Sequence, residues 1–203
     1  MRQHVKDRID DVVGMIYEDG IVTSFPTTAL IPLKYIPNCE LTSYRRLAER
    51  NGTSVREISR YLGSSDGRTE YQRSRDRYLI MINTDRMPAR VQWTIAHEAG
   101  HIFAGHMQED WESRFSRQRE IEEEADYFAA SFLAPLWAIC LLRVRSVSEL
   151  QQKFGLSRTA ASRRWREYQE SGFGMRKRNS IDRPQRSNRP PDIWPDENDP
   201  WCN

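Results

Sequence analysis

The chain has 203 residues, of which 30% are charged and 38% belong to the hydrophobic set AVILMFWYC. This composition is sufficient for one domain of ordinary size with a packed core. Lys and Arg total 31 against 29 Asp and Glu, so the formal net charge is only +2. This near-balance excludes histone-like proteins, which coat nucleic acid through a large basic excess.

Neither a secretory signal nor a membrane span is predicted. The first residues, MRQHVKDRIDDVV, are charged throughout and lack the apolar stretch of a signal peptide. The most apolar segment, residues 128–142, contains Ser131 and Pro135 and falls short of the roughly 20 apolar residues that span a bilayer. The three cysteines are far apart and predict no disulfide framework. We therefore expect a cytoplasmic protein with no membrane partner.

The first 40 residues are expected to form a helix and an extended connection. Apolar residues recur at helical spacing in residues 1–19, and Asp19-Gly20 ends the pattern. Three prolines make residues 21–40 an extended segment without regular structure.

Two short helices are predicted within residues 42–62, where Asn51-Gly52 separates them. Such a pair can bind DNA, but a packed helical hairpin is the more common structure.

A β-hairpin follows, with strands at residues 69–71 and 78–82. The second run is short, apolar and partly β-branched, which is typical of a buried strand. Residues 21–23 are a candidate for an additional strand of the same sheet.

Two longer helices are predicted in the second half. Residues 86–106 carry apolar side chains at three- and four-residue intervals, with Pro88 in the first turn and Gly105 as terminator. Residues 119–133 form the next helix, which Pro135 ends or bends.

The C-terminal part is predicted to contain a helix, a turn and an arginine-rich helix within residues 147–170, followed by a tail without periodicity. We expect four parts in chain order: an N-terminal helix and connection (1–40), a central domain (41–140), a helical portion of helix-turn-helix type (141–172) and a disordered tail (173–203).

The sequence His97-Glu98-Ala99-Gly100-His101 matches H-E-x-x-H inside a predicted helix. Residues four apart on a helix lie one turn above each other, so both imidazoles can share one cation. Glu98 lies between them and can reach a water on that cation without binding it. The alternative is a surface helix whose histidines are bonded to other protein groups.

A zinc site with two histidines needs a third protein ligand and an open position. The predicted helix downstream carries Glu122, Glu123, Glu124 and Asp126. Glu122 could bind the metal while Asp126 bonds the outer nitrogen of a ligating histidine. Because three glutamates are consecutive, Glu124 is the fallback ligand. The alternative is an acidic helix start stabilised by the helix dipole.

These segments resemble the ImmA/IrrE family of metallopeptidase-like proteins. The resemblance covers roughly residues 40–168. It rests on WTIAHEAGHIFAGH (93–106), on ExxAD followed by xFAA (122–130), on Leu133-Ala134-Pro135, on YLIMIN (78–83) with the upstream SSDG, and on ELQQKFGLSRTAASRRW near the C-terminus. One departure is Asp126, where the family more often has Asn; either side chain can accept the same hydrogen bond.

The resemblance implies an α+β fold: a zincin-like minimal metallopeptidase domain with a small sheet packed on the HExxH helix and a helical C-terminal portion. It implies His97, His101 and Glu122 as Zn²⁺ ligands and Glu98 as general base. Proteins of this kind typically act on a helix-turn-helix repressor, so the implied partner is such a repressor, cleaved by a zinc-dependent endopeptidase.

Several alternatives and secondary expectations accompany this interpretation. The protein could instead bind and sequester a repressor without cleaving it. A further alternative is DNA contact through the arginine-rich helix near the C-terminus, which carries Arg158, Arg163, Arg164 and Arg166.

Within the peptidase interpretation, strand 78–83 at the rim of the cleft could pair with an extended substrate. Tyr127 or nearby arginines are candidates to stabilise the oxyanion. His106 is expected to cap its helix or to be exposed.

Overall fold

The computed structural model describes residues 1–172; the predicted disordered tail, 173–203, lies outside the described residues. The elements in chain order are α1 (Gln3–Glu18), η1 (Pro32–Tyr35), β1 (Cys39–Ser43), α2 (Tyr44–Asn51), α3 (Val55–Leu62), β2 (Gly67–Gln72), η2 (Arg73–Arg75), β3 (Arg77–Ile82), α4 (Pro88–Phe103), η3 (His106–Gln108), α5 (Trp111–Ser116), α6 (Gln118–Leu133), α7 (Leu136–Leu141), α8 (Val147–Phe154) and α9 (Arg158–Glu170). The α+β fold predicted from the sequence is confirmed.

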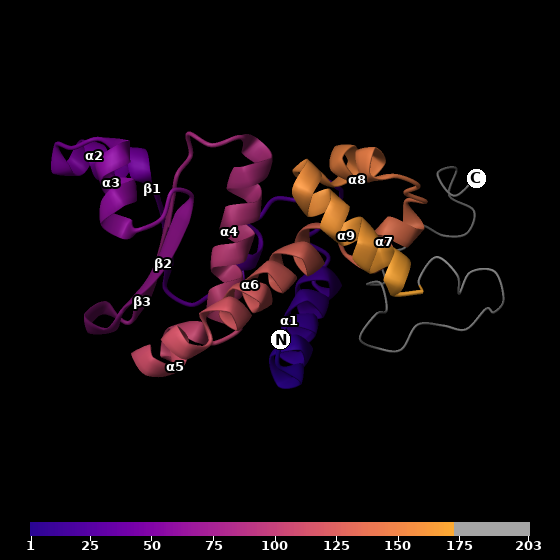
Figure 1. The fold of residues 1–203 in the computed structure, drawn as a ribbon, viewed down its shortest axis with the longest axis horizontal. Helices are drawn as coiled ribbons and strands as arrows, with labels where there is room; N and C mark the ends of the chain where they lie inside the picture. Colours follow the sequence, from indigo (N-terminus) through magenta and orange to yellow (C-terminus); the bar gives the residue numbers. More distant parts are fainter. Residues whose placement is uncertain (173–203) are drawn as a thin grey trace.

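The sheet within residues 1–172 has the strand order β1-β3-β2, with β3 parallel to β1 and antiparallel to β2. Alternate residues of β3 face opposite sides. Ile80 and Ile82 join the core that contains α4, while Met81 joins a smaller core with α2 and α3. The sheet therefore lies between the α2–α3 pair and α4 (Figure 1).

The predicted hairpin is confirmed, but the additional strand was placed wrongly. Residues 21–23 have no regular structure, and β1 pairs with β3 instead, with Cys39 opposite Tyr78 and Ser43 opposite Ile82. Strand β1 lies at an edge of the sheet, and its sequence, CELTS, is mostly polar. It therefore lacks the apolar pattern that predicts a buried strand. Only its pairing with β3 makes it a strand.

Hydrogen bonds to capping side chains define where the two short helices α2 and α3 begin. Ser43 accepts a hydrogen bond from the Arg46 amide and starts α2. Ser54 and Glu57 form a reciprocal capping box at the start of α3. The pair packs on the sheet through Tyr44 and Ile58. A packed helical hairpin is thus the observed arrangement.

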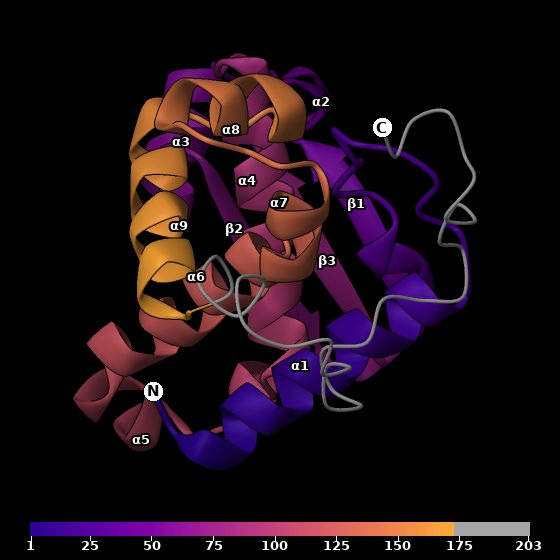
Figure 2. The same ribbon diagram turned by 90° about the vertical axis from the view of Figure 1, so that its right-hand side faces the viewer.

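Helix α1 covers α4 and α6 on the side away from the sheet (Figure 2). Its residues Val5, Ile9 and Ile16 are buried in the same core as Ala160 and Ala161 of α9. The C-terminal helices therefore share a core with the first helix. None of the helices in residues 1–172 combines the length and the apolar character needed to cross a membrane.

The core depends on a very close crossing of α4 and α6. A Cβ atom added at Gly100 would lie 2.9 Å from the Ala125 carbonyl oxygen and 2.9 Å from the Phe128 Cβ. Real Cβ atoms essentially never come so close, so only glycine allows this separation of the two helices. Because Gly100 is part of the HExxH segment, the crossing fixes the position of α6 relative to both histidines.

We expect Gly100→Ala to destabilise the fold. Ala is a better helix former than Gly by about 1 kcal/mol, but overpacking a core costs about 1–3 kcal/mol, and here the obstruction is backbone. The matched control is Gly14→Ala in α1, where an added Cβ meets nothing within 4 Å and stability should rise. Urea unfolding of both variants measures the difference; equal stabilisation would contradict the close crossing.

Candidate metal centre

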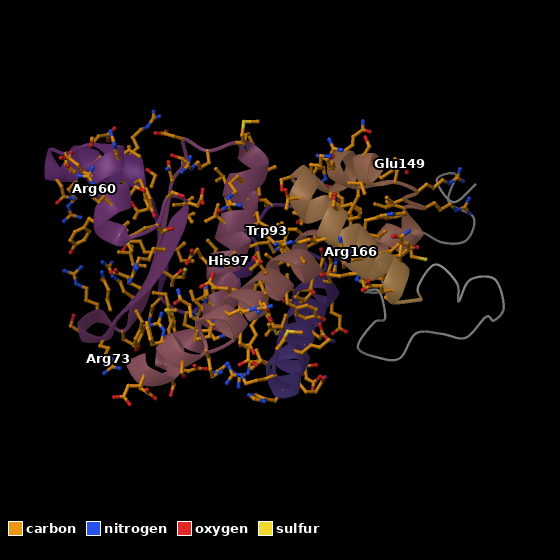
Figure 3. The ribbon with its side chains drawn as sticks, viewed as in Figure 1. Arg60, Arg73, Trp93, His97, Glu149 and Arg166 are labelled. Atoms are coloured by element: carbon orange, nitrogen blue, oxygen red, sulfur yellow. The ribbon has the colours of Figure 1, made fainter. Side chains whose placement is uncertain are left out.

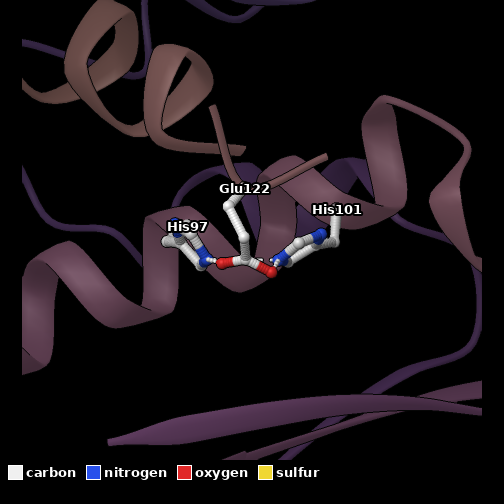
Figure 4. Close-up of side chains that lie close together, drawn as sticks. All are labelled: His97, His101 and Glu122. Carbon is white, nitrogen blue, oxygen red and sulfur yellow. Dashed lines mark hydrogen bonds and ion pairs between the residues drawn. The ribbon is translucent and has the colours of Figure 1, made fainter. Parts of the chain in front are cut away.

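The two histidines of the HExxH segment lie one turn apart on α4, and Glu122 of α6 reaches across to both (Figure 4). His97 Nε2 lies 3.1 Å from His101 Nε2. The Glu122 carboxylate lies between them, with Oε2 3.2 Å from His97 Nε2 and Oε1 3.7 Å from His101 Nε2. The structure thus brings together the three residues that the sequence nominated as metal ligands.

This arrangement fits a small divalent cation. One ligand atom from each of the three residues lies within 4.8 Å of the others. Two ligands at tetrahedral zinc lie about 3.3 Å apart, given metal–ligand distances of about 2.0–2.1 Å. The nitrogen–nitrogen and nitrogen–oxygen separations here match that spacing. Two imidazoles and one carboxylate also leave a coordination position for a substrate or water.

The outer nitrogen of His97 has the partner expected from the sequence. His97 Nδ1 lies 2.9 Å from Asp126 Oδ1, so a proton on Nδ1 leaves Nε2 facing Glu122. The Asp126 side chain is 37% exposed and also lies 3.4 Å from an Arg163 guanidinium nitrogen. Asp126 therefore sits at the cleft surface rather than in the core.

The outer nitrogen of His101 has a partner that the sequence analysis missed. His101 Nδ1 lies 3.0 Å from His106 Nδ1, and His106 Nε2 lies 2.9 Å from Glu124 Oε2. The expectation that His106 caps a helix or is exposed is wrong, because its side chain is 0% exposed. Gly105, with φ of +83°, turns the chain back after α4 and directs His106 inward.

The fallback ligand Glu124 does not belong to the group around His97 and His101. Its side chain is completely buried and contacts His106, Arg2 and Arg117. Glu122 and Glu124 lie on different faces of α6, because residues two apart on a helix point in different directions. The structure brings Glu122, and not Glu124, to the two histidines.

The pKa values of the two histidines are shifted in opposite directions. Burial alone would lower the pKa of His97, but hydrogen bonds to Asp126 and Glu122 raise it to about 10. Burial and the neighbouring His97 lower the pKa of His101 to about 3. The hydrogen bond to His97 lowers the pKa of Glu122. A cation would take the place of the proton that His97 and Glu122 share.

Glu98 lies in the wall of the site and is held by the sheet. Its Oε2 accepts a hydrogen bond of 2.7 Å from Thr69 Oγ1 on β2. Within residues 1–172, no protein hydrogen bond reaches Oε1. Burial raises the pKa of Glu98. Thr69 had no signal in the sequence, because only the close approach of β2 to α4 brings it to Glu98.

That approach depends on a second glycine. A Cβ at Gly67 would lie 2.5 Å from the Thr94 side chain of α4 and 2.8 Å from Ile82. Gly67 therefore lets β2 lie directly against the helix that carries Glu98.

A cleft of about 940 Å³ opens at the site. It is lined by β2, by α4, by the α5–α6 segment and by the start of α9. Trp93 and His97 lie in the middle of the molecule (Figure 3), and both line the cleft. The expectation that strand 78–83 forms the rim is wrong, because β3 is paired on both sides. Strand β2 is the edge strand that faces the cleft.

Of the residues considered as oxyanion stabilisers, the structure places the arginines in the cleft but not Tyr127. Tyr127 donates a 2.7 Å hydrogen bond to Asp10 on α1 and does not line the cleft. Arg114 and Arg163 do line it.

The arginine-rich helix α9 does not present one uniform basic face. Arg164 is 4% exposed, donates a 2.7 Å hydrogen bond to the Ala134 carbonyl and pairs with Glu167. Arg163 lies toward the cleft beside Asp126, and Figure 3 shows Arg166 further along the helix. Arg164 thus ties α9 to the end of α6.

Comparison with known proteins agrees with the site. Residues 48–166, more than half of the chain, match the family Peptidase M78, described as the IrrE N-terminal-like domain. No curated protein matches the chain. The family resemblance carried by the HExxH and ExxAD segments is confirmed, and a metallopeptidase-type function is supported. This chain belongs to the Peptidase M78 family of IrrE N-terminal-like metallopeptidases.

Proposed function

We propose that the protein is a zinc-dependent endopeptidase of the ImmA/IrrE type that acts in the cytoplasm. The observation that carries this proposal is the convergence of His97, His101 and Glu122 beside a buried Glu98 at the wall of a cleft. The donor set of two imidazoles and a carboxylate is one that zinc accepts in hydrolytic sites. When bound, zinc would polarise a peptide carbonyl and lower the pKa of a water molecule at the site.

Glu98 is the residue placed to move a proton. Thr69 fixes one carboxylate oxygen, and the other has no protein hydrogen bond among the described residues. That free oxygen can take a proton from an attacking water and return it to the leaving amine. Because burial raises its pKa, Glu98 is better suited to this exchange near neutral pH than an exposed glutamate would be.

The cleft suits an extended polypeptide. Strand β2 has one unpaired edge beside the site, and an extended segment can add to such an edge through main-chain hydrogen bonds. We propose a helix-turn-helix transcriptional repressor as the substrate, whose cleavage would relieve repression. This substrate class comes from the family resemblance.

The ligand assignment predicts different effects for two neighbouring glutamates. Glu122→Gln should weaken zinc binding by at least about 100-fold, since losing a ligand costs more than the roughly 10–100-fold loss for an outer partner. Glu123→Gln is the matched control, because Glu123 is half-exposed and pairs with Arg119. Chelator competition measures both affinities, and equal affinities would refute the assignment.

Glu98→Gln should abolish cleavage and leave zinc bound. Removing a general base lowers the rate by roughly 10²–10⁴-fold. The purified protein is incubated with zinc and with a repressor encoded beside its gene, and fragments are detected by mass spectrometry. Cleavage by the unaltered protein but not by Glu98→Gln supports the proposal. Loss of repressor binding to its operator with no fragment would instead show a regulator that acts by sequestration.

Thr69→Val should lower the turnover number by roughly 10-fold, because misplacement of a reacting group by about 1 Å can cost up to about 100-fold. Zinc affinity should not change, since the hydrogen-bond partner of Thr69 is Glu98 and not a proposed ligand. The control is Thr94→Val. Thr94 lines the same cleft, and among the described residues its hydroxyl bonds only to the Arg90 carbonyl of its own helix. Equal turnover in the two variants would show that Thr69 does not position Glu98.

A further inference from the structure

A continuous row of buried side chains runs from His101 away from the cleft. His101 Nδ1 lies 3.0 Å from His106 Nδ1, and His106 Nε2 lies 2.9 Å from Glu124 Oε2. The side chains of His106 and Glu124 are both 0% exposed. Neither residue lines the cleft, so neither can touch a substrate.

The hydrogen bonds of this row have one consistent direction. An ionised Glu124 can only accept, so His106 Nε2 must carry a proton. In a neutral imidazole the other nitrogen then accepts, and His101 must donate from Nδ1. This leaves the lone pair of His101 on Nε2, the atom that faces His97 and Glu122. The row thus selects the tautomer and ring orientation that a metal ligand needs.

The far end of the row is anchored by the start of the chain. The Arg2 amide and its Nε donate to Glu124 Oε1 at 3.1 and 3.2 Å, and Arg2 Nη2 donates to Oε2 at 3.2 Å. Arg117 Nη2 lies 3.6 Å from the same carboxylate. Glu109 lies 3.0 Å from both guanidinium groups and balances their charge.

Arg2 lies outside the residues that match the family, which begin at residue 48. Because its backbone and side chain both bind Glu124, helix α1 is tied directly to the support of His101. The N-terminal segment therefore does more than cover the core.

We propose that His106, Glu124 and Arg2 are positioning residues that hold His101 in the tautomer and orientation required to bind the cation, so that the N-terminal segment completes the metal centre. This inference rests on the proposed zinc-binding function. Hydrogen-bonded partners of metal-ligating histidines typically contribute 10–100-fold to metal affinity, as a rough range.

The purely structural alternative makes a different prediction. If the row only stabilised the packing of α1 on α6, its removal would lower the stability of the metal-free protein and leave metal binding unchanged. Metal affinity and the visible spectrum of bound Co²⁺, which reports the ligand geometry, therefore separate the two roles.

The test uses the full chain with the variants His106→Leu, Glu124→Gln and Arg2→Ala. His106→Leu and Glu124→Gln should each weaken zinc binding by roughly 10–100-fold and alter the Co²⁺ spectrum. Arg2→Ala keeps the backbone hydrogen bond to Glu124 and should weaken binding by about 10-fold, at the low end of that range. The control Lys6→Ala removes a cation of α1 whose ion-pair partner is Asp10 rather than Glu124, and this variant should bind zinc normally.

The possible outcomes separate this inference from the proposed function. If the unaltered protein binds no zinc, both are overturned. If it binds zinc and the variants bind it equally well with an unchanged Co²⁺ spectrum, only the positioning role is overturned. Should His106→Leu fail to fold, Glu124→Gln and Arg2→Ala remain as tests, because Gln matches Glu in size and Arg2 is only half-buried, so neither replacement opens a cavity in the core.

Discussion

The separation between α4 and α6 determines whether the three candidate ligands can meet. Glu122 lies on one helix and both histidines lie on the other, so a shift of α6 away from α4 would carry the carboxylate out of reach. Gly100 permits the observed separation, because any side chain there would meet the backbone at Ala125 and the Cβ of Phe128. The glycine inside the HExxH segment therefore acts on the metal centre through packing rather than through chemistry.

The two histidines are supported in unequal ways. His97 is oriented by Asp126, which lies at the cleft surface and also contacts Arg163 of α9. His101 is oriented from the interior, through His106 and Glu124, by Arg2 at the start of α1. One ligand is thus coupled to the C-terminal helices and the cleft, and the other to the N-terminal helix. The sequence predicted both segments only as parts of the chain that precede and follow the central domain, whereas the structure connects each of them to one histidine.

The sequence predicted what depends on local spacing and missed what depends on distant contacts. The four-residue intervals from His97 to His101 and from Glu122 to Asp126 predicted two helices whose polar faces meet, because helical periodicity is a local property. Strand β1, Thr69 and Arg2 carried no such signal. Each acquires its role only through a partner at least 29 residues away, as in the Thr69–Glu98 pair. His106 could have been noticed from its position five residues after His101, but its inward direction depends on the positive φ of Gly105.

The state of Glu98 favours an enzyme over a protein that only binds a partner. Glu98 is largely buried but lines the cleft, so its carboxylate is partly desolvated and still reachable from the site. Thr69 bonds one oxygen, but the described residues supply no partner for the other. A binding surface or a structural zinc site does not need a proton acceptor at this position. A peptidase needs that acceptor beside the cation. Proton transfer therefore gives the position of the Glu98 carboxylate beside the candidate ligands a chemical reason, which sequestration of a repressor alone does not give.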